Sequence, residues 1–160
     1  MTCPKTRQVK AISVKDKINR EHTLETSATI IQTVLTHYPD VQGIYLFGSS
    51  LTEDEWPESD VDLALLLPPG AAKNGRHLAI SDCALELAST LGKEVDLLNA
   101  RTVSTVFQKE IITKGRLLYC ADRFAVDEFE MLTISFYQKL NEERSGIIEA
   151  ALADGRFYKI

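Results

Sequence analysis

The sequence predicts an α/β (α+β) domain, with a small mixed sheet of about four strands flanked by helices and a long C-terminal helical tail. Two observations lead to this fold class. Apolar residues recur at helical spacing in four segments, and short apolar runs bounded by turn residues lie between them. The chain has 160 residues, of which 44% are hydrophobic, so it can build one core of ordinary domain size.

Helices are predicted where apolar spacing is helical and a stop signal follows, over about 24–37, 78–91, 103–114 and 122–152. Pro39 ends the first helix and Gly92 the second, and Gly115 is expected to cap the third. Asp122 is the expected N-cap of the last helix, and Gly146 is expected to kink it or end its main run.

Strands are predicted for the short apolar runs at 41–47, 61–67, 94–98 and 116–120. The last helix carries an apolar stripe of Phe129, Leu132, Phe136, Leu140, Ile147 and Ala151. Two interpretations of this stripe stay open. It packs on the core of its own domain, or part of it meets a partner subunit.

Charge is distributed unevenly, which separates a basic lead-in at 1–20 from a core at 21–121 and a helical segment of the same domain at 122–160. Residues 1–20 contain six basic side chains and one acidic, although the whole chain has a formal net charge of −5. No Lys or Arg occurs between Arg20 and Lys73. The chain beyond residue 20 therefore has an excess of acidic side chains. A surface of this kind repels phosphates unless cations intervene, so direct nucleic-acid binding is not expected.

The cysteines and the apolar runs indicate the compartment. Cys3, Cys83 and Cys120 are odd in number and widely spaced, which fits neither a disulfide framework nor a zinc motif. Cys83 and Cys120 are expected to be small core residues of a cytoplasmic protein. No apolar run approaches the length of a membrane span, and the N-terminus has no secretory h-region.

One stretch carries the chemistry: Gly48-Ser49, then ten residues, then Asp60-Val61-Asp62. Asp60 and Asp62 lie two apart at a strand, so both side chains leave the same face. Two adjacent carboxylates repel each other and need a cation, and oxygen ligands suit Mg²⁺. Asp96, on the third predicted strand, would bring a third carboxylate to that face.

These residues together fit nucleotidyl transfer. Two Mg²⁺ ions held by Asp60 and Asp62 would neutralise a triphosphate, and Asp96 would help to hold one ion and take the proton of an attacking hydroxyl. A glycine after a strand lets backbone amides approach phosphate oxygens, and a serine hydroxyl adds a donor. Gly48 and Ser49 would therefore bind the departing phosphates.

At these residues the chain resembles the DNA polymerase β-like nucleotidyltransferases, from Thr23 to Cys120. Small size, the ten-residue spacer and the tail helix look most like the minimal members, the MntA-type antitoxins of MntA–HepT pairs. The resemblance implies a polymerase β-like fold and transfer of AMP from ATP to a tyrosine of a HEPN-domain ribonuclease toxin (HepT-like), in a hetero-oligomer. It also implies phosphate binding by Gly48 and Ser49, metal binding by Asp60 and Asp62, and Asp96 as the third carboxylate.

The sequence departs from this family at one position and leaves two other functions open. Many relatives continue Gly-Ser with arginine, whereas Ser50 stands here, so Lys73, Arg76, Lys93 or Arg101 would have to supply the charge. The alternatives are an antitoxin that blocks its toxin by binding alone and a nucleotidyltransferase acting on a small-molecule hydroxyl such as an aminoglycoside. The three intact acids argue against the first, and the short chain, which leaves an open site, argues against the second.

Overall fold

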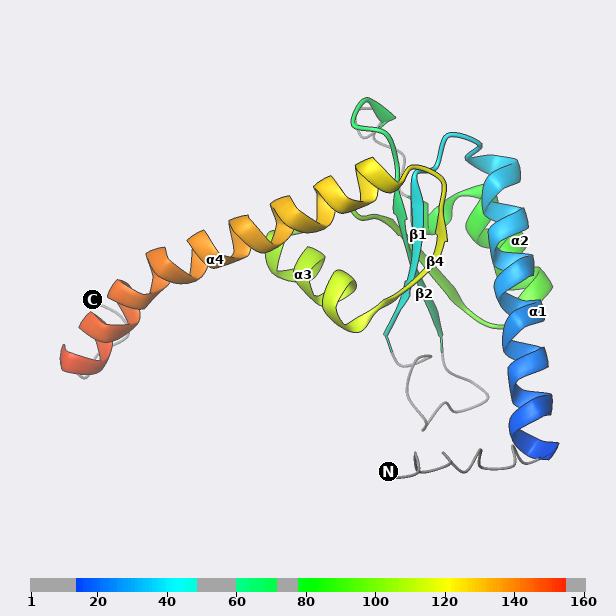
Figure 1. The fold of residues 1–160 in the computed structure, drawn as a ribbon, viewed down its shortest axis with the longest axis horizontal. Coiled ribbons are helices and arrows are strands. Elements are labelled where there is room, and N and C mark those ends of the chain that lie inside the picture. The colour runs from blue at the N-terminus through cyan, green and yellow to red at the C-terminus, as the bar shows by residue number, and fades with distance from the viewer. Residues whose placement is uncertain (1–13, 49–59, 72–77, 155–160) are drawn as a thin grey trace, which may run out of the picture.

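The computed structural model describes residues 14–48, 60–71 and 78–154 (Figure 1). The elements follow the predicted order, with one additional short 3-10 turn. They are α1 (Val14–His37), β1 (Gly43–Phe47), β2 (Val61–Leu66), η3 (Leu78–Ile80), α2 (Asp82–Leu91), β3 (Val95–Asn99), α3 (Thr105–Lys114), β4 (Arg116–Cys120) and α4 (Arg123–Asp154).

The four strands form one mixed sheet in the order β3-β2-β1-β4. The strand β1 pairs antiparallel with both β2 and β4, whereas β2 and β3 are parallel. The predicted mixed sheet of four strands is therefore confirmed. Because the chain leaves β1 at Gly48 and enters β2 after Asp60, these two residues lie at the same end of the sheet.

Helices cover both faces of the sheet, α1 and α2 on one side and α3 and α4 on the other (Figure 1). Alternation along the strands supplies both cores. The core beneath α1 and α2 contains Ile30, Val34, Ile44, Leu63, Leu65 and Leu87. The core beneath α3 and α4 contains Tyr45, Phe47, Leu66, Ile111, Val126 and Phe129.

Local capping explains where the helices begin and end. The Ser81 hydroxyl accepts the Ala84 N–H at 3.3 Å, so α2 begins at Asp82 and the predicted helix over 78–91 is divided into η3 and α2. Gly92 ends α2 in the left-handed conformation, as expected (φ 65°). Gly115 is the C-cap of α3, as expected, with an extended backbone (φ −76°) and its N–H donating to the Ile111 carbonyl. The Asp122 carboxylate accepts the Ala125 N–H at 3.0 Å, as expected for an N-cap.

Three expectations about the ends of the chain and the cysteines are wrong. The first helix begins at Val14, so residues 14–20 of the predicted lead-in are helical. The helix α4 runs through Gly146 to Asp154 without ending there, because one glycine costs a helix only about 1 kcal/mol. Cys83 is buried as predicted, but Cys120 at the end of an edge strand is exposed.

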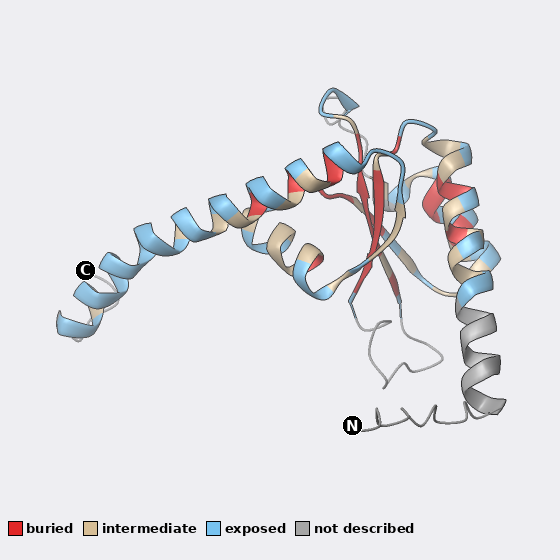
Figure 2. Cartoon of the chain, in the orientation of Figure 1, coloured by how far each residue is buried: buried red, intermediate tan, exposed pale blue. Residues whose placement is uncertain are grey.

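Only the first part of α4 packs on the domain (Figure 2). Ala125, Val126, Phe129 and Thr133 are buried, whereas residues 141–150 are all exposed. The apolar stripe continues from the buried to the exposed part of the helix. Its first member, Phe129, is therefore a core residue, while Leu132, Phe136 and Ile147 are exposed in the single chain.

Candidate active site

The sheet brings the three predicted acids together. Asp62 of β2 and Asp96 of β3 are register partners in a parallel pair, so their side chains leave the same face of neighbouring strands about 4.8 Å apart. Asp60 lies two residues before Asp62 and is exposed, as is Asp96. Phe47, which belongs to the core beneath α3 and α4, is the partner of Asp62 on β1. The acids therefore face the side of the sheet that carries α3.

Electrostatics at Asp62 reflect this crowding. Its carboxylate is half-buried, and burial raises its pKa above the ordinary aspartate value, with further increases from the charges of Asp96 and Asp60. The carboxylates of Asp96 and Asp60 thus disfavour ionisation of Asp62. This arrangement costs stability unless a cation binds, which is typical of a functional site.

Gly48 shapes the same site from β1. Its φ is +82°, a conformation that L side chains rarely adopt. A Cβ atom on Gly48 would overlap the Asp62 Oδ2 atom and lie 2.9 Å from Cγ of that carboxylate. Glycine is therefore required here by its backbone conformation and by the space that Asp62 fills. Ser49 lies outside the described residues.

The four basic residues that were predicted to replace the missing arginine lie in different places. Lys73 and Arg76 lie outside the described residues, and Lys93 precedes β3 at the same end of the sheet as the acids. Arg101 is at the opposite end, because its Nε donates to the Leu67 carbonyl at 2.7 Å, beyond the far end of β2. Its guanidinium also donates to Gln42 at 2.9 Å, so the prediction for Arg101 is wrong.

Other residues near the acids were missed by sequence analysis. Arg116 opens β4 at the same end of the sheet, but it is the register partner of Leu46, so its side chain leaves the face opposite the acids. Phe107 of α3 packs against Phe47 with ring centroids 5.5 Å apart. No local pattern indicates that Phe107 lies beside Phe47, because α3 and β1 are far apart in the chain.

The chemistry of the acids fits Mg²⁺ bound together with a nucleotide. Among the described residues, no three His, Cys, Asp or Glu side chains form a group that would hold a metal ion by themselves. Mg²⁺ keeps several waters and is commonly bound by one or two carboxylates plus substrate phosphates. Two neighbouring aspartates beside a glycine turn satisfy that requirement, with the remaining ligands left to phosphate oxygens and water.

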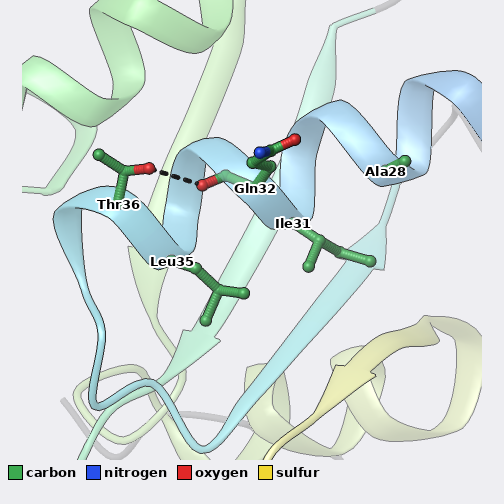
Figure 3. Close-up of a pocket in the computed structure, with 5 residues that line it drawn as sticks. All are labelled: Ala28, Ile31, Gln32, Leu35 and Thr36. Carbon is green, nitrogen blue, oxygen red and sulfur yellow. Dashed lines mark hydrogen bonds between the residues drawn. The ribbon is translucent and has the colours of Figure 1, made fainter.

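A separate hollow lies along α1 and is lined by Ala28, Ile31, Gln32, Leu35 and Thr36 (Figure 3). Ile31 and Leu35 pack on the core beneath α1 and α2, so the hollow is on the face opposite the acids. The Thr36 hydroxyl there donates to the Gln32 carbonyl at 2.9 Å. This hollow has no charged lining and is distinct from the carboxylate cluster.

Comparison with known proteins places the chain in a class. Residues 29–124 match the polymerase beta nucleotidyltransferase family, a range that contains Gly48, Asp60, Asp62 and Asp96. The chain therefore belongs to the polymerase beta nucleotidyltransferase family. The predicted fold class is confirmed. No described helix has the length and hydropathy needed to traverse a bilayer.

Within this family the chain is similar to an antitoxin enzyme. The protein adenylyltransferase MntA of Shewanella oneidensis is 37% identical over 126 residues, which are 78% of this chain and 86% of that protein. A toxin–antitoxin crystal structure with AMP-PNP contains a chain that is 35% identical, with a TM-score of 0.64, covering 79% of this chain and 98% of its own length. A complex of tri-AMPylated Shewanella oneidensis HEPN toxin with MNT antitoxin matches at 32% identity and a TM-score of 0.63, over 81% and 98% of the two chains.

Proposed function

We propose that this protein is an Mg²⁺-dependent protein adenylyltransferase that transfers AMP from ATP to a tyrosine of a HEPN-family toxin (HepT-like) and so neutralises it. The observation that carries the proposal is the in-register pair Asp62–Asp96, with Asp60 on the same face. Similarity to the adenylyltransferase MntA, and to an antitoxin in complex with an AMPylated HEPN toxin, supports the donor and the acceptor. The two described cysteines, Cys83 and Cys120, are free, which agrees with action in the cytoplasm.

Each site residue has a role in this proposal. Asp60 and Asp62 would hold two Mg²⁺ ions, Asp96 would help to hold one of them, and backbone amides at Gly48 and Ser49 would hold the outer phosphates. The bound ions would neutralise the triphosphate and the leaving group. Asp96 accepts the proton of the tyrosine hydroxyl, whose oxygen forms a bond to the α-phosphorus. The bond from that phosphorus to the bridging oxygen breaks, and pyrophosphate leaves with this oxygen.

Positioning and electrostatics supply most of the expected rate. The strand β2 fixes Asp60 and Asp62 relative to each other, and β3 fixes Asp96 beside them. Gly48 lets the backbone of β1 approach the Asp62 carboxylate closely. The acids are on an open face, since Asp60 and Asp96 are exposed, which suits a protein acceptor better than a small molecule that must be enclosed.

The test is to incubate the protein with Mg–ATP and a HEPN-type toxin partner and then to measure the intact mass of the toxin. We expect the toxin to gain mass in AMP units, and the D60N/D62N variant to give no gain while keeping its fold. A matched control, E25Q/D40N, removes two exposed carboxylates away from the site and should transfer AMP at the parental rate.

Other results would assign one of the alternatives. A stable complex without any mass gain would indicate an antitoxin that acts by binding alone. Neither complex nor gain would direct attention to small-molecule hydroxyls. Transfer by D60N/D62N at the parental rate would show that the metal ligands are other residues.

A further inference from the structure

One flank of α3 borders the carboxylate cluster. Val103, just before the helix, and Val106, Phe107, Glu110 and Lys114 recur three or four residues apart, which places them along one side of α3. The opposite side of α3 meets α4, where the Lys109 ammonium lies 5.3 Å from the centre of the Tyr137 ring. The flank is therefore turned away from α4, toward the part of the sheet that carries the acids.

Phe107 connects this flank to the acids. Its ring meets the Phe47 ring edge to face, at an interplanar angle of 83° and a centroid distance of 5.5 Å. Phe47 is in turn the cross-strand neighbour of Asp62 and leaves the same face of the sheet. Phe107 thus packs on a side chain of β1, and β1 is the neighbour of the strand β2 that carries Asp62.

The side chains on this flank remain partly open to solvent. Phe107 is 37% exposed and Val106 is 38% exposed. Leu98, two residues after Asp96 and on the same face of β3, is only partly buried against the core beneath α3 and α4. The acids therefore have apolar surface beside them, and an aromatic ring is its largest component.

The charges on the flank are compatible with a bound nucleotide. The Glu110 carboxylate contacts Lys109 Nζ at 3.3 Å and Lys114 Nζ at 2.5 Å, and these two lysines lower its pKa. On the flank itself the charges of Glu110 and Lys114 cancel, and Lys109 reaches Glu110 from the side of α3 that meets α4. The flank does not add negative charge to the side of the site where a triphosphate would bind.

We propose that Phe107, with Val106 beside it, is the platform on which the base of the nucleoside triphosphate stacks. The proposal rests on the proposed function, which places the outer phosphates at Gly48 and the metal ions at Asp60 and Asp62. Stacking on an aromatic ring requires an apolar face, partial exposure and a position beside the phosphates, and Phe107 provides all three. It binds any base, with a larger contact for purines, and so accounts for nucleotide binding without a recognition motif for adenine.

The test separates the base from the phosphates by comparing two ligands. Binding of Mg–ATP and of Mg–tripolyphosphate is measured by calorimetry for the wild type, F107L and F107Y. Leucine keeps apolar packing against Phe47 but removes the aromatic face. We expect F107L to raise the Kd for ATP about tenfold, while the Kd for tripolyphosphate stays within about twofold. F107Y, which keeps an aromatic ring, should bind ATP about as the wild type does.

The control is F124L, which changes an exposed phenylalanine at the start of α4, at the opposite end of the sheet, and should bind both ligands as the wild type does. Equal weakening of ATP and tripolyphosphate in F107L would overturn the stacking role, because the loss would come from the carboxylates. Unchanged ATP binding with a higher KM for the toxin would overturn it in favour of a protein contact. Wild-type protein that binds neither ligand would instead refute the proposed function.

Discussion

Gly48 and the Asp62 carboxylate are in direct contact, so that no atom fits between the end of β1 and this acid of β2. The glycine has a positive φ, and a Cβ atom built on it would overlap Oδ2 of Asp62. The chain thus meets two requirements with one residue, a left-handed backbone and space for a carboxylate. Any side chain at position 48 must displace the acid or change the path of the chain.

The first prediction is that G48A loses AMP transfer. The added methyl group moves the Asp62 carboxylate away from Asp60 and Asp96, and displacement of a positioned group by about 1 Å can cost about 100-fold in rate. The positive φ adds a stability cost of roughly 1 kcal/mol. Transfer is measured by intact mass of the toxin partner, and stability by thermal unfolding.

Gly92 supplies the matched control for the backbone cost. It also has a positive φ (65°), but nothing lies within 4 Å of the position that a Cβ would take. G92A should therefore lose similar stability and keep its transfer rate. Equal loss of activity in both variants would show that backbone strain, and not the displaced carboxylate, causes the effect.

The second prediction concerns Asp62 and pH. Burial and the charges of Asp96 and Asp60 raise the pKa of this carboxyl in the folded state. The folded protein therefore holds this proton to a higher pH than the unfolded chain, and stability falls as pH rises above the ordinary aspartate pKa of about 3.9. The D62N substitution removes the ionisable group and with it this loss of stability. At pH 7 without divalent cations the variant should melt about 2–4 °C higher than the wild type, and it should lose AMP transfer.

The pH series is the decisive part of that experiment. The gain of D62N should shrink as pH falls toward 3, where the wild-type carboxyl is protonated in both states. The exposed Asp40, for which D40N is the control, should show no such gain at pH 7. A D62N protein that is less stable than the wild type at pH 7 would contradict the repulsion described here.

The third prediction separates two thiols. Cys83 is buried, and burial, with a smaller effect from Glu86, raises its pKa to about 11, whereas Cys120 is exposed on β4. In a C3S background at pH 8, iodoacetamide should alkylate Cys120 and leave Cys83 unmodified, since the thiolate is the reactive form. Peptide mapping measures both sites, and guanidinium should make both reactive. Equal labelling of the native protein would contradict the burial of Cys83.

Local patterns in the sequence were sufficient for much of this structure. The spacing of apolar residues predicted the order of helices and strands, and Asp60-Val61-Asp62 predicted two acids on one face. The third acid was expected on the same face because Asp96 lies within an apolar strand, and the parallel register of β2 and β3 agrees with that. The first two features depend on neighbours in the chain, which a sequence shows directly, whereas the position of Asp96 also depends on the pairing of β2 with β3.

Features that depend on distant pairing were not predicted. Arg101 follows β3, and only the parallel direction of that strand shows that it lies at the end away from the acids. Phe107 approaches the site because α3 crosses the face of the sheet that carries the acids. The helix does not end at Gly146, one of the two outcomes expected there, because helical backbone on both sides outweighs the preference of one residue.

The last prediction concerns the stripe on α4 as a surface for the toxin. Phe136 is 56% exposed and Ile147 is 70% exposed, and both continue the side of the helix that is buried at Phe129. Glutamate at either position should change the free energy of unfolding by no more than about 0.5 kcal/mol, because neither side chain is in the core. If the stripe contacts the toxin, F136E and I147E should weaken the complex at least tenfold, measured by calorimetry. The control S145E adds the same charge on another side of α4 and should bind normally. Unchanged binding with lower stability in F136E would instead place the stripe in the core of its own domain.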